Sequence, residues 1–533
     1  MDATTSAQQG AQTIPSDSTA AATSAPLIAS APLSVEEEVA AELLAMQDVE
    51  ANYFAFARNE ELGRVVPYAP RRTSGRRAHG GEYGSYWRSR TSLVDYTIVP
   101  RGDADRETVA SLQEKIRRAA KGGDDAPTLT QTEQRLSHAM ASFVSMAIGD
   151  ALGAPMEFRA VNYNDDQPVV TELHYDTSGS FGLQPGQWTD DASMGACIAD
   201  SLLRRGGFDP FDLKVRFVSW WDHGYNNAFR FQPPTSSLWG GSNRGSVGLG
   251  GNISMSFSEF ERNGQVFTKV GDRNTCGNGS LMRNGALAVY YHDQEQKAID
   301  VARLQSYLTH QGEEAAECCA LLTFVSRYAI ENPGMSKEQL LGSLTSPGAI
   351  DRFADLTTCA SAKCMARSQI EPPGDNLDRN WQWRAVEFRY SPSRSRQQPG
   401  YVGSYCMDAL SMALHCVWST HDYRTALVKA ANRCGDADSV CDITGQVAGA
   451  LYGFQAIPES WMPVLTRWDN NEFAVKAYKM FTKRHLVLPP LDEAPREALM
   501  STATVEAAAA AAPPAAAGAA LGSREDSDPF SMI

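Results

Sequence analysis

Apolar residues recur at every third or fourth position over several long stretches of this chain, a spacing that predicts α-helices. The first stretch runs from Gln134 to Ile148 and leads into a glycine-rich turn. Further helices are predicted from Ala192 to about Arg205, from Tyr405 to Trp418, and from Ser439 to near Gly453. The chain shows no internal repeats, and we place these helices in one folded domain that spans residues 132–489.

The last of these helices carries Gly445, Gly449 and Gly453 at intervals of four residues. Glycine is less favourable than alanine in a helix interior by about 1 kcal/mol per residue. A stripe of glycines therefore needs a structural reason, and we predict that this face of the helix packs closely against another helix.

The segments outside the domain differ from it in composition. Residues 1–33 consist largely of Ala, Ser, Thr and Gln, and residues 490–533 are rich in Ala and Pro, so both ends are predicted to be disordered. Residues 34–131 form an N-terminal extension, in which one amphipathic helix with a capping box is predicted from Ser34 to about Leu62. The part from Arg64 to Gly123 is basic and loop-like, and we interpret it as a solvated linker rather than a nuclear-import or nucleic-acid-binding patch.

Composition and charge argue against several classes of protein. The net charge of −15 and the pI near 5.2 are not typical of a general nucleic-acid binder. No apolar run reaches the roughly 20 residues that a membrane-spanning helix needs, and no basic residue precedes Arg58, so neither a span nor a signal peptide is predicted. The ten cysteines, from Cys197 to Cys441, show no CxxC spacing, which indicates neither a zinc cluster nor a disulfide framework. We expect a soluble monomer in a reducing compartment, the cytoplasm or the nucleus.

Two helix starts in the domain are rich in side chains that carry oxygen. One is Thr189-Asp190-Asp191 and the other is Asp436-Ala437-Asp438-Ser439. Asp, Ser and Thr are common N-cap residues, so each cluster by itself could be a capping turn. Carboxylates and hydroxyls are also the ligands that a hard divalent cation prefers. Because the pattern occurs twice, we predict that the two helix starts meet around one polynuclear metal site.

Two further acidic residues follow the first predicted helix. Asp150 lies in the glycine-rich turn, and Glu157 stands seven positions later, a spacing that would place both on one face of an unbroken helix. Gly153 and Pro155 predict a break, so both side chains are expected to point into a common cavity from a helix end. Taken singly, an Asp and a Glu are ordinarily surface residues.

A second glycine-rich turn, from Cys276 to Arg283, leads into another apolar helix. Glycines allow close approach of the backbone, and N–H groups at a helix start suit a phosphate. Arg283 could add a charge-assisted contact, although the same turn is compatible with a tight loop that binds no ligand. Thr309-His310 precedes a further helix, where a single histidine is more often structural than catalytic.

Taken together, these motifs resemble those of the ADP-ribosylglycohydrolase family, which includes the arginine- and serine-linked ADP-ribose hydrolases and the dinitrogenase-reductase-activating glycohydrolase. Five motifs follow the family's order between about residues 135 and 485, and five in order are far more specific than any one of them. Ala192 and Ser439 stand where threonine is frequent in the family, and Ser439 keeps the hydroxyl group. The motifs are Gly149-Asp150-Ala151-Leu152-Gly153 with Glu157, Gly186-Gln187-Trp188-Thr189-Asp190-Asp191 with Met194, Gly277-Asn278-Gly279-Ser280-Leu281-Met282-Arg283, Thr309-His310, and Gly435-Asp436-Ala437-Asp438-Ser439 with the helix that follows.

The resemblance implies an all-α fold, a compact orthogonal helix bundle with a two-metal site at the base of a cleft for ADP-ribose. It implies two Mg²⁺ ions, with Mn²⁺ as an alternative, and makes Glu157 a movable ligand or acid/base group that Asp150 supports. By position the metal ligands would be Thr189, Asp190, Asp191, Asp436, Asp438 and Ser439. The catalytic residues would be Glu157, Asp190 and Asp150, and the substrate-binding residues would be Asn278, Gly279, Ser280, Met282, Arg283, His310 and Tyr405.

The function that the resemblance implies is hydrolysis of the glycosidic bond at the distal ribose, which removes ADP-ribose from modified protein side chains. Such cleavage builds oxocarbenium-like charge, and metals with a carboxylate can hold the ribose and a water and manage the proton. An arginine linkage is predicted, because the second cluster looks closer to arginine-directed members and an acidic rim attracts a cationic guanidinium. Two alternatives stay open: a non-catalytic ADP-ribose-binding or structural member of the family, and a two-metal phosphohydrolase.

Overall fold

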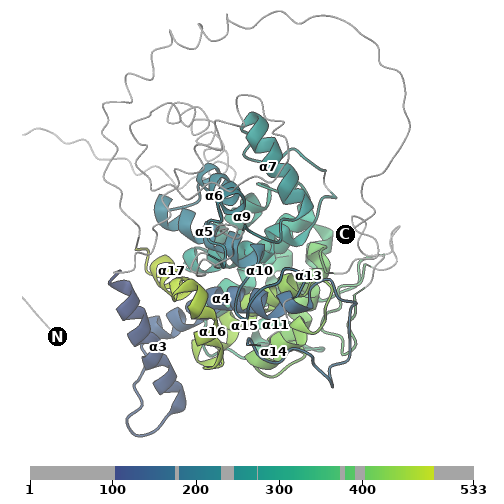
Figure 1. Ribbon diagram of the computed structural model, residues 1–533. Coiled ribbons are helices and arrows are strands. Elements are labelled where there is room, and N and C mark those ends of the chain that lie inside the picture. Colours follow the sequence, from purple (N-terminus) through teal and green to yellow (C-terminus); the bar gives the residue numbers. More distant parts are fainter. Residues whose placement is uncertain are drawn as a thin grey trace, which may run out of the picture. The chain divides into compact units, whose positions relative to one another are not determined.

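The computed structural model of the protein describes residues 103–174, 179–229, 245–272, 274–372, 379–390 and 403–484 (Figure 1). Over these ranges the regular secondary structure is helical, and the strand-type pairings there are two isolated bridges, Gly277 with Tyr405 and Ile370 with Asn380. The prediction of an all-α fold is confirmed. The predicted helix from Ser34 to Leu62 and both predicted disordered ends lie outside the described residues.

Four predicted helices are present as α4 (Gln131–Gly153), α5 (Asp190–Arg205), α13 (Cys406–Trp418) and α15 (Ala437–Tyr452). The other α-helices are α3 (Asp105–Lys121), α6 (Pro210–His223), α7 (Gly251–Asn263), α8 (Gly285–Tyr290), α9 (Glu295–Ser306), α10 (Glu313–Glu331), α11 (Lys337–Leu341), α12 (Ala360–Arg367), α14 (Tyr423–Ala431), α16 (Trp461–Asp469) and α17 (Glu472–Phe481). Short 3₁₀ turns are η3 (Ala154–Met156), η4 (Asn278–Ser280), η5 (Met282–Asn284), η6 (Ala349–Asp355) and η8 (Phe454–Ala456).

Helix α4 forms the core of the described helices, and every residue from Leu136 to Gly153 is buried. It starts with a capping box between Thr130 and Glu133, which the apolar spacing alone does not reveal. By length and composition the 26 residues Gln131–Met156 could cross a membrane, so the prediction that no apolar run is long enough is wrong. Nearly all of this segment is buried against other helices. A helix at the centre of a protein core is surrounded by apolar neighbours on every side, as a membrane-spanning helix is, so both kinds of helix are apolar all round.

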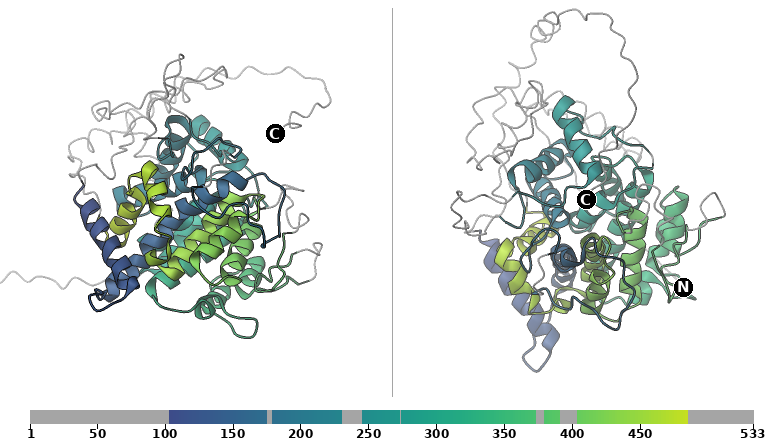
Figure 2. Two further views of the ribbon diagram at one scale, coloured as in Figure 1. Left: turned by 60° about the horizontal axis from the view of Figure 1, so that its bottom comes forward. Right: turned by 45° about the vertical axis from the view of Figure 1, so that its right-hand side comes forward.

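Helices α4 and α15 pack against each other along most of their length (Figure 2). A Cβ atom added at Gly445 would lie 2.2 Å from the carbonyl oxygen of Ser145, so only glycine allows this approach. The predicted close packing of the glycine stripe is confirmed for Gly445 and Gly449, whereas Gly453 ends the helix with a φ of 75°. The distance from an added Cβ to the facing carbonyl oxygen is 2.4 Å for Gly449 and Ala141, 2.3 Å for Gly149 and Cys441, and 2.3 Å for Gly153 and Ala437.

Helix α3 lies in the stretch that was predicted to be a loop-like linker, and that prediction is wrong for Asp105–Lys121. Its apolar residues Val109, Leu112 and Ile116 recur at helical spacing and are buried. The basic residues of this helix lie mostly on its exposed face and at its end. Their number suggested a solvated linker, although the buried apolar positions form one face of an amphipathic helix. Helix α3 packs against α17, which is the last described helix.

All ten cysteines are free and buried, which confirms that no disulfide framework holds the fold. Their burial raises thiol pKa values, as at Cys318, where the pKa is about 11.

Candidate metal centre

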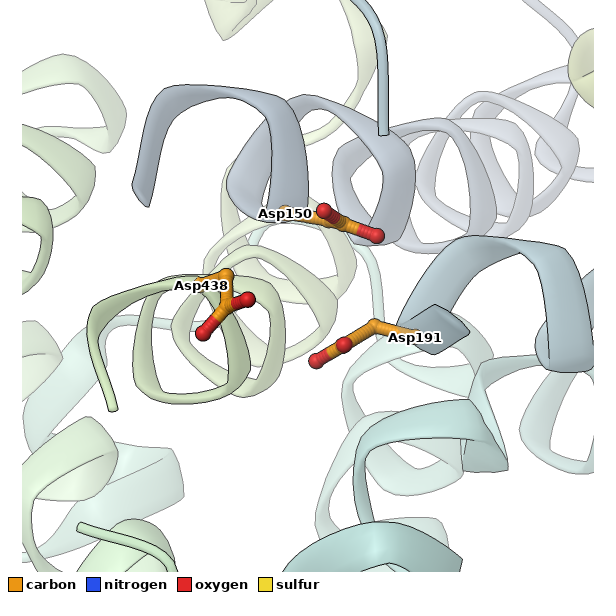
Figure 3. Close-up of side chains that lie close together, drawn as sticks. All are labelled: Asp150, Asp191 and Asp438. Carbon is orange, nitrogen blue, oxygen red and sulfur yellow. The ribbon is translucent and has the colours of Figure 1, made fainter. Parts of the chain in front are cut away.

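Carboxylates from three helices point toward one another at one end of the α4–α15 pair (Figure 3). Asp150 comes from α4, Asp191 from α5 and Asp438 from α15, and one oxygen of each lies within 4.8 Å of the others. A second group with the same limit consists of Glu157, Asp436 and Asp438. Because Asp438 belongs to both groups, the five carboxylates form one continuous cluster, which we call the acid cluster.

Asp150 holds the start of α5 in place. Its carboxylate accepts hydrogen bonds from the N–H of Thr189 at 2.9 Å, the hydroxyl of Thr189 at 3.0 Å and the N–H of Ala192 at 3.0 Å. A side chain of α4 therefore binds the free N–H groups at the start of α5, which a local cap would otherwise bind. Thr189 makes no capping hydrogen bond to its own helix, so the capping interpretation of this cluster is not supported.

Asp436 is likewise no cap for α15, because its side chain makes no capping hydrogen bond. It accepts a hydrogen bond of 2.8 Å from the amide of Asn278 instead. The preceding residues Cys434 and Gly435 have φ values of 61° and 67°, and this left-handed bend aims Asp436 toward Asn278 rather than back over its own helix. The carbonyl of Gly435 also accepts the N–H of Phe158 at 2.8 Å, which fixes the backbone beside Glu157.

The break that Gly153 and Pro155 predict between Asp150 and Glu157 is confirmed. Helix α4 continues to Gly153, the 3₁₀ turn η3 follows, and Glu157 has extended backbone geometry. The two carboxylates thus reach the acid cluster from different directions, Asp150 beside Asp191 and Glu157 beside Asp436.

The acid cluster is buried and has no counter-charge from the part of the chain that the structure describes. Its members are at most 9% exposed, and within the described ranges none of them forms a salt bridge. One oxygen of Glu157 (Oε2) and one of Asp191 (Oδ1) have no hydrogen-bond partner in this part of the chain. Buried oxygens without donors or cations are costly, so the site suits a ligand that supplies positive charge.

The raised pKa values of these carboxyl groups also show that no nearby positive charge in the described part of the chain offsets their burial. Burial raises the pKa of Asp150 to about 7. Burial and the nearby charge of Asp436 raise the pKa of Glu157 to about 9. For Asp191 and Asp438, burial and neighbouring carboxylates raise the pKa well above its ordinary value. A hard divalent cation, which favours oxygen ligands, would stabilise all of these groups in their ionised form.

Asp190 is placed differently from the other predicted ligands. It belongs to neither carboxylate group, and its Oδ1 would lie 1.9 Å from a Cβ added at Gly248. Gly248 has a φ of 90°, so the backbone of residues 245–250 covers Asp190 where no side chain would fit. The hydroxyl of Thr189 lies 3.1 Å from Asp191, and that of Ser439 lies 3.8 Å from the sulfur of Met282.

The predicted substrate-binding residues divide into two sets. Asn278, Gly279 and His310 lie together beside the acid cluster, since Asn278 bonds Asp436 and His310 packs on Gly279. In the other set, the hydroxyl of Ser280 pairs with that of Ser306 at 2.7 Å. The hydroxyl of Tyr405 bonds Glu314 and Arg379, and the carbonyl of Met282 accepts the amide of Gln446 at 2.6 Å.

The predicted substrate-binding residue Arg283 points into the interior of the protein. The side chain is fully buried, with its guanidinium 4.3 Å from the centre of the Phe217 ring. It donates to the side chain of Gln305 at 2.9 Å, to the carbonyl of Gln305 at 3.0 Å and to Thr309 at 2.9 Å. Sequence spacing shows that an arginine follows the turn, but not on which side of the turn it lies.

One buried carboxylate near the cluster was not predicted. Asp442 follows Asp438 by one helical turn, is fully buried and has one oxygen without a partner in the described ranges. Its other oxygen accepts the amide of Gln446 at 3.0 Å, and Gln446 also binds the carbonyl of Met282. The signal was the four-residue spacing of Asp438, Asp442 and Gln446, which places them on one face of α15.

Comparisons with known proteins identify relatives of this chain. A sequence model described as ADP-ribosylglycohydrolase matches residues 131–486. The chain is 27% identical to an ADP-ribosylarginine hydrolase of Serratia proteamaculans (strain 568), over 64% of this chain and 79% of that protein. It is 29% identical to an ADP-ribosylarginine hydrolase of Pseudomonas putida (strain GB-1), over 69% of this chain and 82% of that protein.

A third relative is an ADP-ribosyl-dinitrogen reductase glycohydrolase of Rhodospirillum rubrum, which is 24% identical over 61% of this chain and 90% of that protein. The matched residues include α4, α5 and α15 and every carboxylate of the acid cluster. Since the match extends over well over half of the sequence, this chain belongs to the ADP-ribosylglycohydrolase family.

Proposed function

We propose that this protein is a metal-dependent hydrolase that removes ADP-ribose from modified arginine side chains of proteins by cleaving the glycosidic bond at the distal ribose. One observation carries the proposal: five buried carboxylates, from four segments of the chain, meet around Asp438 without a cation from the described part of the protein. An arrangement that serves stability alone would include a lysine or arginine partner.

The donor set fits two Mg²⁺ ions, with Mn²⁺ as an alternative, because all of the nearby ligand atoms are oxygens. Asp191, Asp436 and Asp438, with the hydroxyls of Thr189 and Ser439, would hold the ions. Bound cations would supply Lewis acidity and hold ribose hydroxyls and a water. Asp150 would position Asp191 through its hydrogen bonds to the start of α5.

Glu157 is our candidate for the acid/base group or movable ligand. Its Oε2 is buried without a partner in the described residues, and its pKa is raised to about 9 by burial and by Asp436. Beside bound cations, which favour its ionised form, Glu157 can take a proton from the attacking water and pass it to the leaving group. In this proposal, Glu157 protonates the departing side-chain nitrogen while the other carboxylates stabilise the positive charge that develops on the ribose.

One experiment distinguishes the proposed hydrolase from a two-metal phosphohydrolase and from a non-catalytic member of the family. The full chain is incubated with an ADP-ribosylated protein and Mg²⁺, and free ADP-ribose and inorganic phosphate are measured separately. We expect ADP-ribose release that chelation abolishes. Phosphate release would indicate a two-metal phosphohydrolase. Binding of ADP-ribose without any release would indicate a non-catalytic member of the family, and undiminished turnover after exhaustive chelation would contradict the metal site.

The arginine linkage is supported by the two relatives that are named ADP-ribosylarginine hydrolases. A cationic guanidinium leaving group also suits a site with five buried carboxylates. We expect a higher kcat/KM for ADP-ribosylarginine than for ADP-ribosylserine, measured on matched peptides. The reverse preference would contradict the linkage and leave the rest of the proposal standing.

A further inference from the structure

Arg283 is linked to His310 through the hydroxyl of Thr309. The Nη2 atom of Arg283 donates to Thr309 Oγ1 over 2.9 Å, and Thr309 Oγ1 lies 2.8 Å from His310 Nδ1. The three residues are 0%, 1% and 2% exposed. Nη1 of Arg283 has no partner among the described residues, but the Nη2–Thr309–Nδ1 path is continuous, so the hydrogens along this path can be assigned one by one.

The assignment determines the tautomer of His310. A guanidinium has donors and no acceptor, so Thr309 Oγ1 accepts from Arg283 and keeps one hydrogen of its own to donate. Among the described residues its side-chain contacts are those with Arg283 and His310, so that hydrogen goes to His310 Nδ1. If Nδ1 carried the hydrogen instead, the hydroxyl hydrogen of Thr309 would be buried without an acceptor. His310 therefore carries its ring hydrogen on Nε2.

The ring of His310 is neutral. Burial lowers its pKa to about 3, and the positive charges of Arg283 and Lys214 add to this effect. Both cations are fully buried, and neither forms a salt bridge in the part of the chain that the structure describes. A neutral ring with its hydrogen on Nε2 is a donor at one edge and an acceptor at the other.

The Nε2 edge of His310 faces the glycine-rich turn. A Cβ added at Gly277 would lie 3.2 Å from His310 Nε2, and one added at Gly279 would lie 3.1 Å from Cε1, so the ring occupies the space that side chains there would need. The amide nitrogen of Asn252 lies 3.2 Å from the same Gly277 position. Nε2 has no hydrogen-bond acceptor among the described residues. His310 Nε2 and the amide nitrogen of Asn252 therefore both lie beside the backbone of Gly277.

We propose that Arg283 and Thr309 are positioning residues that hold His310 as its Nε2–H tautomer, so that its Nε2–H is offered to the substrate on the side of the glycine-rich turn. The nature of the ligand rests on the proposed function. Asn278, the neighbour of Gly277, donates to Asp436 of the acid cluster. The glycine-rich turn thus connects His310 to the carboxylates, where the distal ribose of the ligand would lie.

The test is the nitrogen NMR spectrum of the full chain with ¹⁵N-labelled histidine, recorded without ligand, with the His310 signals assigned by their loss in His310→Gln. We expect a protonated Nε2 and an unprotonated Nδ1. In Thr309→Val the shape of the side chain is kept and its hydroxyl is lost, so the signals should move toward a mixture of tautomers. The Kd for ADP-ribose should rise about tenfold, which corresponds to 1.4 kcal/mol, with a larger change in KM than in kcat.

Thr309→Ser should restore both the spectrum and the Kd, because it restores the hydroxyl. Thr420→Val is the matched control, since it removes another buried threonine hydroxyl, one that bonds a helical carbonyl at 2.7 Å. A protonated Nδ1 in the wild-type spectrum would overturn the proposal whatever the stability of the variants, as would a serine variant that restores neither property. The spectrum needs no turnover, so an inactive wild-type protein would contradict the proposed function and not the tautomer.

Discussion

Two of the regions that bury carboxylates in this protein differ in what neutralises the charge. Between α3 and α17, Asp103 and Asp105 each lie 2.8 Å from the ammonium of Lys479, and Asp105 also pairs with Arg484. In the acid cluster, Asp438 is buried to a similar extent, and within the described ranges no lysine or arginine pairs with it. The carboxylates of the first region are neutralised by residues of the protein, whereas those of the second region are not neutralised by any residue in the described ranges.

The pKa values of the two regions move in opposite directions. Burial raises the pKa of Asp103, but the hydrogen bond and charge of Lys479 outweigh it, so the pKa lies below its ordinary value. At Asp438, burial and the carboxylates around it act together and raise the pKa well above its ordinary value. A buried carboxylate is thus evidence of a ligand site when its surroundings lack a cation, and evidence of a structural contact when they contain one.

The largest expected effect comes from Asp438→Asn, because Asp438 belongs to both carboxylate groups. We expect ADP-ribose release to fall roughly 10⁴-fold or more and Mg²⁺ binding to weaken strongly, with little loss of stability in the metal-free protein. Release assays, calorimetric titration and thermal unfolding measure the three quantities. The matched variant is Asp105→Asn, which should lower stability and leave activity unchanged. Unfolding of Asp438→Asn would contradict the comparison.

Removing α3 should have the next largest effect. In a chain shortened to the family match, residues 131–486, Lys479 loses both carboxylates and the apolar face of α17 loses Val109, Leu112 and Ile116. We expect the free energy of unfolding in urea to fall on the order of 5 kcal/mol relative to residues 103–484. Activity per folded molecule should persist, because the acid cluster lies inside both chains. Equal stability of the two chains would show that α3 is dispensable.

Lys479→Met removes the cation that neutralises the buried carboxylates between α3 and α17. It leaves Asp105 with Arg484 and Asp103 with the nearby charge of Arg106, so we expect a loss of about 3 kcal/mol in unfolding free energy. Lys115→Met, on α3, is the control. Its pair with Glu133 is partly exposed, with side-chain exposures of 35% and 25%, and should contribute less than about 1 kcal/mol. Similar losses for both variants would mean that burial of the pair does not matter.

The smallest expected effect is a pH dependence of stabilisation by metal. The pKa of Glu157 rises from its ordinary 4.5 to about 9 on folding, so the folded metal-free protein binds a proton that the unfolded chain releases between these values. Its stability should therefore fall as pH rises through this range. Mg²⁺ competes with that proton, and we expect it to raise Tm by a few degrees more at pH 8.5 than at pH 6, measured by thermal unfolding with Mg²⁺ or chelator. An equal rise at both values would count against protonation of the cluster.

Much of the helical framework could be predicted from local sequence. The apolar periods place α4, α5, α13 and α15 correctly to within a few residues, and the glycines of α15 predict its close packing. Helix α3 was missed although Val109, Leu112 and Ile116 have helical spacing, because the density of charge around them suggested a linker. The capping box at Thr130 and the unusual burial of α4 also have signals in the sequence, in Glu133 and in the long apolar run.

The sequence by itself determined which residues are available to the site: two oxygen-rich helix starts, Asp150, Glu157 and a glycine-rich turn, in the order that the family shows. Only the tertiary structure decided how they are used. It made Asp438 the shared carboxylate, placed Asp190 against Gly248, and turned Arg283 inward toward Thr309. The reason is physical: helix periodicity and turn composition are local properties, whereas the direction of a side chain at a helix end depends on which distant backbone packs against it.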